Sequence, residues 1–387
     1  MKKYSKKLLV ILLAFVLCFT MFTACGGAMN SGDGEGEGGG DAAAAETFSW
    51  KVQAYTATGT TFYEYAEHLC NLIETMSGGR IDIDLYGSGE LVAAFDVPNA
   101  IRDGILDAEY GYAGLWTSVE YGMALFCSTP CEFSDPFDVL YWLEYGGGYD
   151  IWRETIAQYD CTVYAGGILD AENFLWSDEK IESVKDLQKL QIRMMPVMGD
   201  ILAANGVSCV FLAGDEVVSS MERKVIDAGE YSTSALDETF GFQDVAHYYY
   251  KPGLHQPTSV QEFVISNKAF DALPEDLQAI VVSACQSNLW WTWMENGVRN
   301  SAANVRFKDM GREQIVFDDE MVATITDWVV KWFDEKEAED PFIKRVRESQ
   351  KTFMQWWVPY KEAMDIPYAD WTRERADEMP FNLEKSN

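Results

Sequence analysis

Residues 48–86 read FSWKVQAYTATGTTFYEYAEHLCNLIETMSGGRIDIDLY, and this stretch decides the fold class. The pattern predicts a strand over Phe48 to Thr56 and an alternating strand over Ile81 to Tyr86. Between them, apolar residues recur at helical spacing from Phe62 to Met76, and the pair Gly78-Gly79 is a helix stop. A strand, a helix and a second strand of these lengths are typical of the start of an α/β sheet.

The next elements extend this pattern. We expect a helix over Phe95 to Asp103 and a strand near Ala108 to Ala113, which gives the order βαβαβ of a doubly wound sheet. Further strands are predicted at Cys161 to Gly167, Leu190 to Met195, Val225 to Tyr231 and Phe263 to Asn267. A chain of 387 residues is long enough for two α/β lobes, and crossing strands between them would leave a ligand cleft.

A late apolar-periodic stretch runs from Pro274 to Lys308 without an interrupting proline, and Gly297 is its weak point. It predicts one very long helix or two shorter ones. Aromatic residues also recur towards the chain end, from Phe342 to Trp357. They predict either packing onto the chain's own lobe or a face that binds a partner or a second copy in a homodimer.

The charge is strongly acidic. The chain has 30 Lys and Arg against 62 Asp and Glu, a net charge of −32. Residues 1–24 hold four Lys and no acid, so the remainder has 26 basic against 62 acidic residues, which is −36. This field repels phosphate backbones and anionic headgroups, so we expect no nucleic-acid partner and no docking to membranes through a basic patch. An anionic ligand would need a local cation.

The N-terminus has the features of an export signal. Four lysines precede the apolar run from Leu8 to Phe22, which predicts a signal peptide over residues 1–24. The sequence Phe22-Thr23-Ala24-Cys25 resembles a bacterial lipobox, so we expect Cys25 to be lipidated; an ordinary cleavage site with an incidental Cys is the alternative. Residues 25–46 are rich in Gly and acid and predict a flexible tether. The protein should therefore be extracytoplasmic and lipid-anchored to the cell membrane.

Catalytic motifs are missing from the sequence. It has three histidines, His68, His247 and His255, and neither an H-E-x-x-H nor a G-x-S-x-G motif. Six cysteines follow Cys25, and we expect buried free thiols, although their number and location also allow disulfides. We therefore predict that the protein is not an enzyme and has no catalytic residues or catalytic cofactor.

Several segments together resemble a known family. They are Ser183 to Arg193, Val225 to Tyr231, Tyr248 to Gly253, Phe263 to Glu275 and Asp340 to Ser349. Their order and spacing are similar to solute-binding proteins of TRAP (tripartite ATP-independent periplasmic) transporters, DctP family, over about residues 48–360. The resemblance implies a two-lobed α/β periplasmic-binding-protein fold (Venus flytrap) with a long late helix. It also implies capture of a small organic acid and its delivery to the TRAP membrane permease subunits.

We expect the following organisation of the chain: a signal peptide at 1–24; the lipidated Cys and tether at 25–46; lobe I at 47–170 plus about 265–300; lobe II at 171–264 plus about 305–335; and a C-terminal helical extension at 336–387.

Arg193 is the first candidate ligand-binding residue. It lies on a predicted strand beside the apolar Ile192 and Met194, so its side chain projects to the opposite face. A guanidinium can hold a carboxylate through two parallel hydrogen bonds, and the resemblance implies this role for Arg193. The alternative is that Arg193 pairs with one of the many acidic residues.

The resemblance further points to the branch that binds 2-oxo or 2-hydroxy acids through a metal ion. It implies that Glu230, the carbonyl of Tyr231 and Gln256 hold the cation, with Glu172, Tyr231 and Trp116 against the substrate. Glu172 stands where the branch usually has Gln, and Tyr231 where it has Trp. Oxygen ligands suit Na⁺ or Ca²⁺.

Charge counting favours Ca²⁺, since two glutamates and the substrate carboxylate would face Arg193 alone. The alternatives are that Glu172 is solvated and that Trp116 belongs to the core.

Two other functions remain open from the sequence. An ABC-type lipoprotein for sugars or other solutes is favoured by 13 Trp and 19 Tyr, which could stack on sugar rings. The other is a secreted hydrolase that uses a pair of carboxylates. With 62 acidic residues the sequence does not exclude such a pair, but their abundance means that no single pair points to it.

Overall fold

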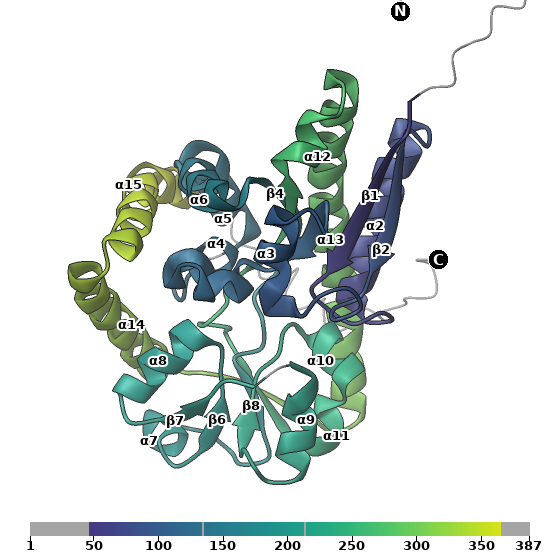
Figure 1. Ribbon diagram of the computed structural model, residues 1–387. Helices are drawn as coiled ribbons and strands as arrows, with labels where there is room; N and C mark the ends of the chain where they lie inside the picture. Colours follow the sequence, from purple (N-terminus) through teal and green to yellow (C-terminus); the bar gives the residue numbers. More distant parts are fainter. Residues whose placement is uncertain (1–45, 134, 213, 365–387) are drawn as a thin grey trace, which may run out of the picture. The chain divides into compact units, whose positions relative to one another are not determined.

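The computed structural model describes residues 46–133, 135–212 and 214–364 (Figure 1). The predicted signal peptide, Cys25, nearly all of the predicted tether and residues 365–387 lie outside the described residues. Within the described part of the chain, no helix is long and apolar enough to cross a membrane.

The first sheet has five strands in the order β2-β1-β3-β10-β4. Strand β1 pairs in parallel with β2 and β3, whereas β10 runs antiparallel to β3 and β4. The strands are β1 (Phe48–Ala54), β2 (Ile81–Tyr86), β3 (Ala108–Gly111), β4 (Cys161–Leu169) and β10 (Ser259–Ser266).

The helix that connects β1 and β2 has clear signals at both ends. Helix α2 (Thr61–Ser77) begins after Thr60, whose hydroxyl accepts a hydrogen bond from the N–H of Tyr63. It ends at Gly78, which has a φ of 64°. A left-handed residue at this position is favourable only for glycine, and this explains why the Gly-Gly pair stops the helix.

The second sheet has six short strands in the order β11-β9-β5-β8-β6-β7. Strand β6 lies between β7 and β8 and is parallel to both. The strands are β5 (Leu175–Ser177), β6 (Gln191–Arg193), β7 (Ser208–Val210), β8 (Ala228–Gly229), β9 (Tyr248–Lys251) and β11 (Glu313–Val316).

Three segments connect the two sheets. Residues 170–174 lead from β4 to β5, residues 252–258 lead from β9 to β10, and α13 (Glu275–Asp309) with residues 310–312 leads back to β11. Strand β10 begins at Ser259, six residues before the expected start of the returning segment at 265. It does so because all eight of its residues pair with β4, which places them in the first sheet.

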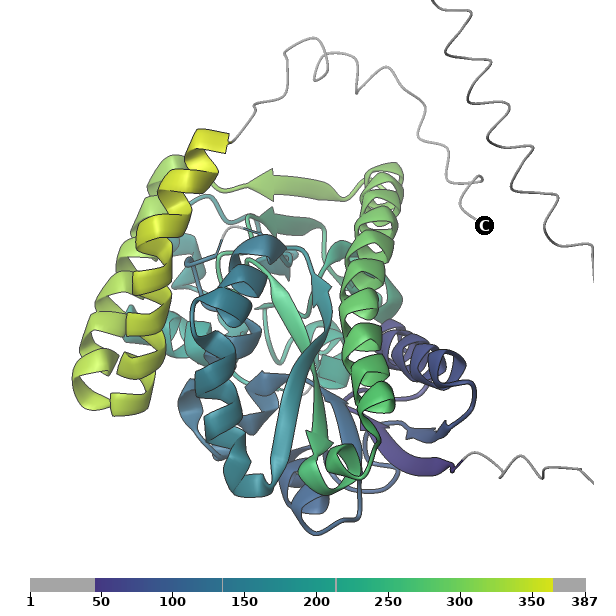
Figure 2. The same ribbon diagram turned by 90° about the horizontal axis from the view of Figure 1, so that it is seen from above.

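Helix α13 is one unbroken helix of 35 residues, and Gly297 lies inside it (Figure 2). It packs against β4, α2 and α10 (Ser234–Phe240). Leu277 and Val281 belong to the core beneath the first sheet, while Ala303 and Phe307 belong to the core beneath the second. The long late helix therefore contributes to both cores.

The last helix packs against α5 (Pro136–Tyr145) and α6 (Gly148–Ile156), whereas α14 (Asp319–Glu339) packs against the last helix and against α8 (Pro196–Ala204) of the second sheet. In α15 (Pro341–Met364), Trp357 stacks on Tyr141 with ring centroids 4.3 Å apart, and its indole donates to Asp138. The chain-end aromatic residues thus pack partly on their own lobe. Trp356 and Tyr360 of α15 are exposed, and a face that binds a partner or a second copy stays a prediction.

The remaining helices complete the covering layers. Their bounds are α3 (Val97–Arg102), α4 (Ala124–Cys127), α5 (Pro136–Tyr145), α6 (Gly148–Ile156), α7 (Val184–Leu187), α8 (Pro196–Ala204), α9 (Gly214–Glu222), α11 (Phe242–Val245), α12 (Asn267–Asp271) and α14 (Asp319–Glu339), with 3₁₀ turns η1 (Ala94–Asp96), η2 (Ala113–Ser118), η3 (Tyr121–Met123) and η4 (Ala157–Tyr159).

The cysteines of the described residues are free thiols, and Cys131 and Cys209 are the two that are only half-buried.

Candidate functional site

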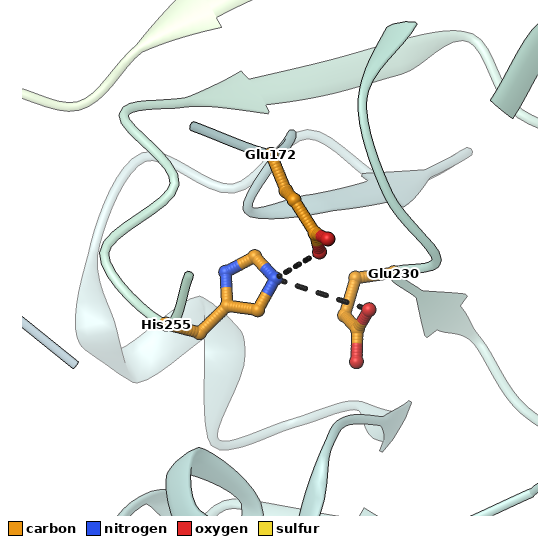
Figure 3. Close-up of side chains that lie close together, drawn as sticks. All are labelled: Glu172, Glu230 and His255. Atoms are coloured by element: carbon orange, nitrogen blue, oxygen red, sulfur yellow. Dashed lines mark ion pairs between the residues drawn. The ribbon is translucent and has the colours of Figure 1, made fainter. Parts of the chain in front are cut away.

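Four buried polar side chains meet where the segments between the sheets pass each other. Arg193 ends β6, and Glu230 directly follows the parallel strand β8, so both lie at the same edge of the second sheet. Glu172 and His255 come from the two segments that connect the sheets. All four are at most 4% exposed. Four segments far apart in the sequence therefore build one site, and Figure 3 shows three of its side chains, Glu172, Glu230 and His255.

Three of these side chains point at one place. The Nε2 atom of His255 lies 3.3 Å from Glu172 Oε2 and 3.8 Å from Glu230 Oε2 (Figure 3). The ligating atoms of the three residues lie within 4.8 Å of one another, and these two oxygens and Nε2 have no hydrogen-bond partner among the described residues. Buried polar atoms without a partner are costly, so their convergence fits a bound cation.

The second oxygen of Glu172 is held by the protein. Oε1 accepts a hydrogen bond of 2.8 Å from the Gln256 side-chain amide and one of 3.3 Å from the Ser232 hydroxyl. Burial raises the pKa of Glu172 above its ordinary value, although His255 opposes this. With Oε1 fixed, Oε2 faces His255.

Glu230 is held in the same way. Its Oε1 lies 2.7 Å from Arg193 Nη1 and accepts a hydrogen bond of 2.8 Å from the backbone N–H of Met195. Its Oε2 is the oxygen that remains for a ligand. Each glutamate therefore uses one oxygen for positioning and presents the other.

Arg193 forms an ion pair with Glu230. Pairing with an acidic residue was one of the two roles that the sequence left open for Arg193. Its Nη1 also donates to the Glu230 carbonyl at 2.7 Å, and its Nε donates to the Leu212 carbonyl at 3.1 Å. Its Nη2 contacts only the sulfur of Met195, at 3.6 Å, among the described residues. That nitrogen is the part of the guanidinium left for an anionic ligand.

Gln256 and Tyr231 lie beside the site. Gln256 donates to Glu172, and its amide oxygen accepts a hydrogen bond of 2.9 Å from the hydroxyl of Tyr112. Both polar atoms of Gln256 thus have protein partners. The ring of Tyr231 packs against Phe62 and Phe240, at centroid distances of 6.4 Å and 4.2 Å.

Trp116 lies in the core of the first lobe. It is 1% exposed and packs edge-on against Tyr159, with ring centroids 5.6 Å apart. A cavity of about 20 Å³ beside His255 is lined instead by Tyr112, together with Gly114, Met195, Pro196 and Gln256. The structure therefore does not bring Trp116 together with the other candidates.

Sequence reasoning missed His255 and Tyr112. The signal for His255 was its place directly before the candidate Gln256 and two residues after the Pro-Gly pair. Tyr112 follows β3 and reaches the site only through the fold, so no local pattern distinguished it from the other tyrosines.

Comparisons with known proteins agree with this architecture. The model of the family described as bacterial extracellular solute-binding protein, family 7 (DctP), matches residues 52–338. A monocarboxylate 2-oxoacid-binding periplasmic protein of Nostoc sp. is 26% identical over 324 residues, which cover 83% of this chain and 86% of that protein.

Two crystal structures show the same fold. A TRAP transporter solute-binding protein from Bordetella bronchiseptica, with calcium and picolinate bound, has a TM-score of 0.80 at 22% identity and covers 86% of this chain and 99% of its own. A second TRAP solute-binding protein, from Pseudoalteromonas atlantica with sodium and pyruvate bound, has a TM-score of 0.77 at 21% identity. The match covers 87% of this chain and 100% of that protein's chain. The predicted two-lobed α/β fold is thereby confirmed.

The family match covers most of the described residues, including all the residues of the site. It confirms the resemblance seen in the sequence and agrees with a binding protein rather than an enzyme. The chain belongs to family 7 of the bacterial extracellular solute-binding proteins, the DctP family.

Proposed function

We propose that this protein is the receptor of a TRAP transporter and captures a small 2-oxo or 2-hydroxy monocarboxylic acid, which it delivers to the membrane permease. The observation that carries this proposal is the buried group of Arg193, Glu172, Glu230 and His255, with free atoms converging from three chain segments. Such a group is suited to holding a small charged solute away from water.

A cation supports the capture of an acid at this site. Two glutamates face one arginine, so an incoming carboxylate would meet an excess of negative charge in a buried place, which is strongly unfavourable. A cation between Glu172 and Glu230 would change the sign of this interaction and bridge the protein to the acid.

The ligands of the two crystal structures described above share one chemical feature. Pyruvate and picolinate both carry a second donor atom on the carbon next to the carboxylate, and both were found with a metal ion in the structures described above. A carboxylate oxygen and this second donor can bind one cation together. We therefore infer that an acid with an oxygen on its second carbon is the preferred ligand here.

Calorimetry with purified protein tests the proposal. The protein is first treated with a chelator and then titrated with pyruvate, lactate, propionate and glucose, each with and without an added divalent metal. We expect pyruvate or lactate to bind only with metal, and propionate to bind at least about tenfold more weakly because it lacks the second donor. Binding of glucose without any acid binding would instead support the ABC-type alternative.

The proposed receptor would be held at the outer side of the cell membrane by a lipid on Cys25, followed by the tether. The net charge of −36 after residue 24 supports a covalent anchor, because such a chain has no electrostatic attraction to anionic lipids. Metabolic labelling with a radioactive fatty acid tests this. Label should enter the wild-type protein and be lost in Cys25→Ser.

A further inference from the structure

His255 adds a nitrogen donor to a site for which the sequence predicted only oxygen ligands. We propose that Glu172, Glu230 and His255 hold a divalent transition-metal ion, of the class of Mn²⁺, Fe²⁺, Co²⁺ or Zn²⁺, in preference to Ca²⁺ or Na⁺. This inference rests on the proposed function and names the cation of the same site.

The spacing between His255 Nε2 and the two glutamate oxygens is that of ligands sharing an ion. Two atoms that each lie about 2.0–2.2 Å from one metal are roughly 2.8–3.8 Å apart at bond angles of 90–120°. The distances from His255 Nε2 to the two glutamate oxygens are 3.3 Å and 3.8 Å. Both exceed the usual length of an N–H to oxygen hydrogen bond, which is about 2.9 Å.

The same atoms are free for coordination. Glu172 Oε2, Glu230 Oε2 and both ring nitrogens of His255 are buried and lack hydrogen-bond partners among the described residues. Because no donor among the described residues hydrogen-bonds to Nδ1, no such bond forces the ring's proton onto Nε2. Nε2 can therefore offer its lone pair to a metal, while Gln256 and Arg193 keep the two carboxylates in place.

The donor set distinguishes the classes of cation. Ca²⁺ takes six to eight oxygen ligands in proteins, and Na⁺ likewise prefers oxygen. Imidazole suits transition metals, and carboxylates are accepted by Mn²⁺, Fe²⁺ and Zn²⁺ as well. Two carboxylates and one imidazole leave coordination positions open, which a chelating 2-oxo acid can fill.

The charges of the site and its ligand also balance when the ion is divalent. Two glutamates and Arg193 sum to one negative charge, and a neutral His255 adds none. A divalent ion brings the site to one positive charge, which the carboxylate of one ligand neutralises. With Na⁺ the site would be neutral before the acid arrives and negative afterwards.

The test compares metals on chelator-treated protein that carries no polyhistidine tag. ZnCl₂, MnCl₂ and CaCl₂ are titrated calorimetrically into the wild type, His255→Gln and the control His247→Gln, which changes a histidine outside the site. We expect the wild type to bind Zn²⁺ or Mn²⁺ at least about tenfold more tightly than Ca²⁺. His255→Gln should lose this preference because an amide oxygen replaces the imidazole, and His247→Gln should keep it.

Visible absorption of added CoCl₂ gives a second readout. Its ligand-field bands should appear in the wild type and change in His255→Gln, while circular dichroism shows that the variant is folded. If Ca²⁺ binds as tightly as Zn²⁺ and the substitution alters neither, the assignment of the metal is wrong even if pyruvate binds. If pyruvate binds equally well without metal, the metal site is refuted.

The proposed receptor function fails in a different way. Tight Co²⁺ binding through His255 without binding of any acid in any metal form would leave the metal site standing and overturn the receptor for 2-oxo and 2-hydroxy acids.

Discussion

Arg193 combines two tasks that need a planar group with several donors. Its Nε and Nη1 bind the carbonyls of Leu212 and Glu230 and the Glu230 carboxylate, which fixes the guanidinium in the site. Its Nη2 is left with only a sulfur contact. An ammonium group has the charge but not this divided geometry.

Arg193→Lys should therefore weaken the binding of pyruvate although the charge is kept. Loss of one charge-assisted hydrogen bond costs about 1.5–3 kcal/mol, which corresponds to roughly 10- to 100-fold in Kd. Calorimetry on this variant and on Arg299→Lys, a control in an exposed ion pair of α13, measures the difference. Equal affinity in both variants would exclude Arg193 from ligand binding.

Glu109 and Glu262 form a second buried acidic pair, away from the proposed metal ligands. They lie on the neighbouring strands β3 and β10 and are 1% and 0% exposed. Burial raises the pKa of Glu109 to about 8, and it raises the pKa of Glu262 well above its ordinary value, with a further rise from the Glu109 charge. At neutral pH the Glu109 carboxyl therefore favours its protonated form in the folded protein.

The free energy of unfolding should consequently fall as the pH rises from about 4.5 to about 8. In this window the folded carboxyl binds its proton while the unfolded one has released it, so raising the pH favours the unfolded state. Urea unfolding of Glu109→Gln should show a weaker pH dependence and a higher stability than the wild type near pH 8. The exposed Glu216→Gln serves as control, and parallel pH profiles for all three proteins would contradict the prediction.

At the scale of elements, the site depends on two connecting segments that touch. The N–H of Glu172 donates to the carbonyl of Gln256 at 3.1 Å. A Cβ atom on Gly253 would lie only 2.2 Å from the carbonyl oxygen of Glu172. The segment between β9 and β10 can thus pass the segment between β4 and β5 only because residue 253 has no side chain.

Gly253→Ala should push these segments apart and separate Glu172 from His255. We expect loss of metal and pyruvate binding, and a destabilisation of about 1–3 kcal/mol from the overlap. Gly297→Ala is the matched control, since its added Cβ meets only Asp170 at 3.7 Å and lies inside helix α13. It should keep binding and raise the stability by about 0.5–1 kcal/mol. Thermal unfolding measures the stability of both variants, and calorimetry measures their metal and pyruvate binding. Unchanged metal binding in Gly253→Ala would contradict this account.

At the scale of the whole molecule, a hydrogen bond between η3 and α8 links the two lobes outside the site. The hydroxyl of Tyr121 in η3 donates to Asp200 in α8 at 2.6 Å. Burial, together with the nearby Asp200 carboxylate, raises the pKa of Tyr121. A link of this kind stabilises a closed arrangement of the lobes without touching the ligand.

We expect metal and pyruvate together to close the lobes and reduce the radius of gyration in solution scattering. Tyr121→Phe should shift the equilibrium towards the open form and speed ligand dissociation by about 2- to 10-fold, since one hydrogen bond contributes about 0.5–1.5 kcal/mol. The exposed Tyr145→Phe is the control. Scattering curves that do not change on ligand addition would rule out closure by the ligand.

Local signals were sufficient for the first elements of the fold. The strand expected over residues 81–86 has those bounds, and the helix expected over 62–76 spans Thr61–Ser77, because periodicity and a glycine stop act within a few residues. The second sheet was harder to delimit, since β8 has two residues and β5, β6 and β7 have three each. Strands this short are set by their pairing partners rather than by their own pattern.

For the site, the sequence alone placed Arg193, Glu172, Glu230 and Gln256 among the candidates, and these four do come together. Only the tertiary structure decided that His255 joins the two glutamates, that Tyr112 rather than Trp116 reaches Gln256, and that Gln256 serves to hold Glu172. The physical reason is that a side chain's chemistry is local, whereas its burial, its partners and the atom it leaves free depend on segments up to 144 residues apart.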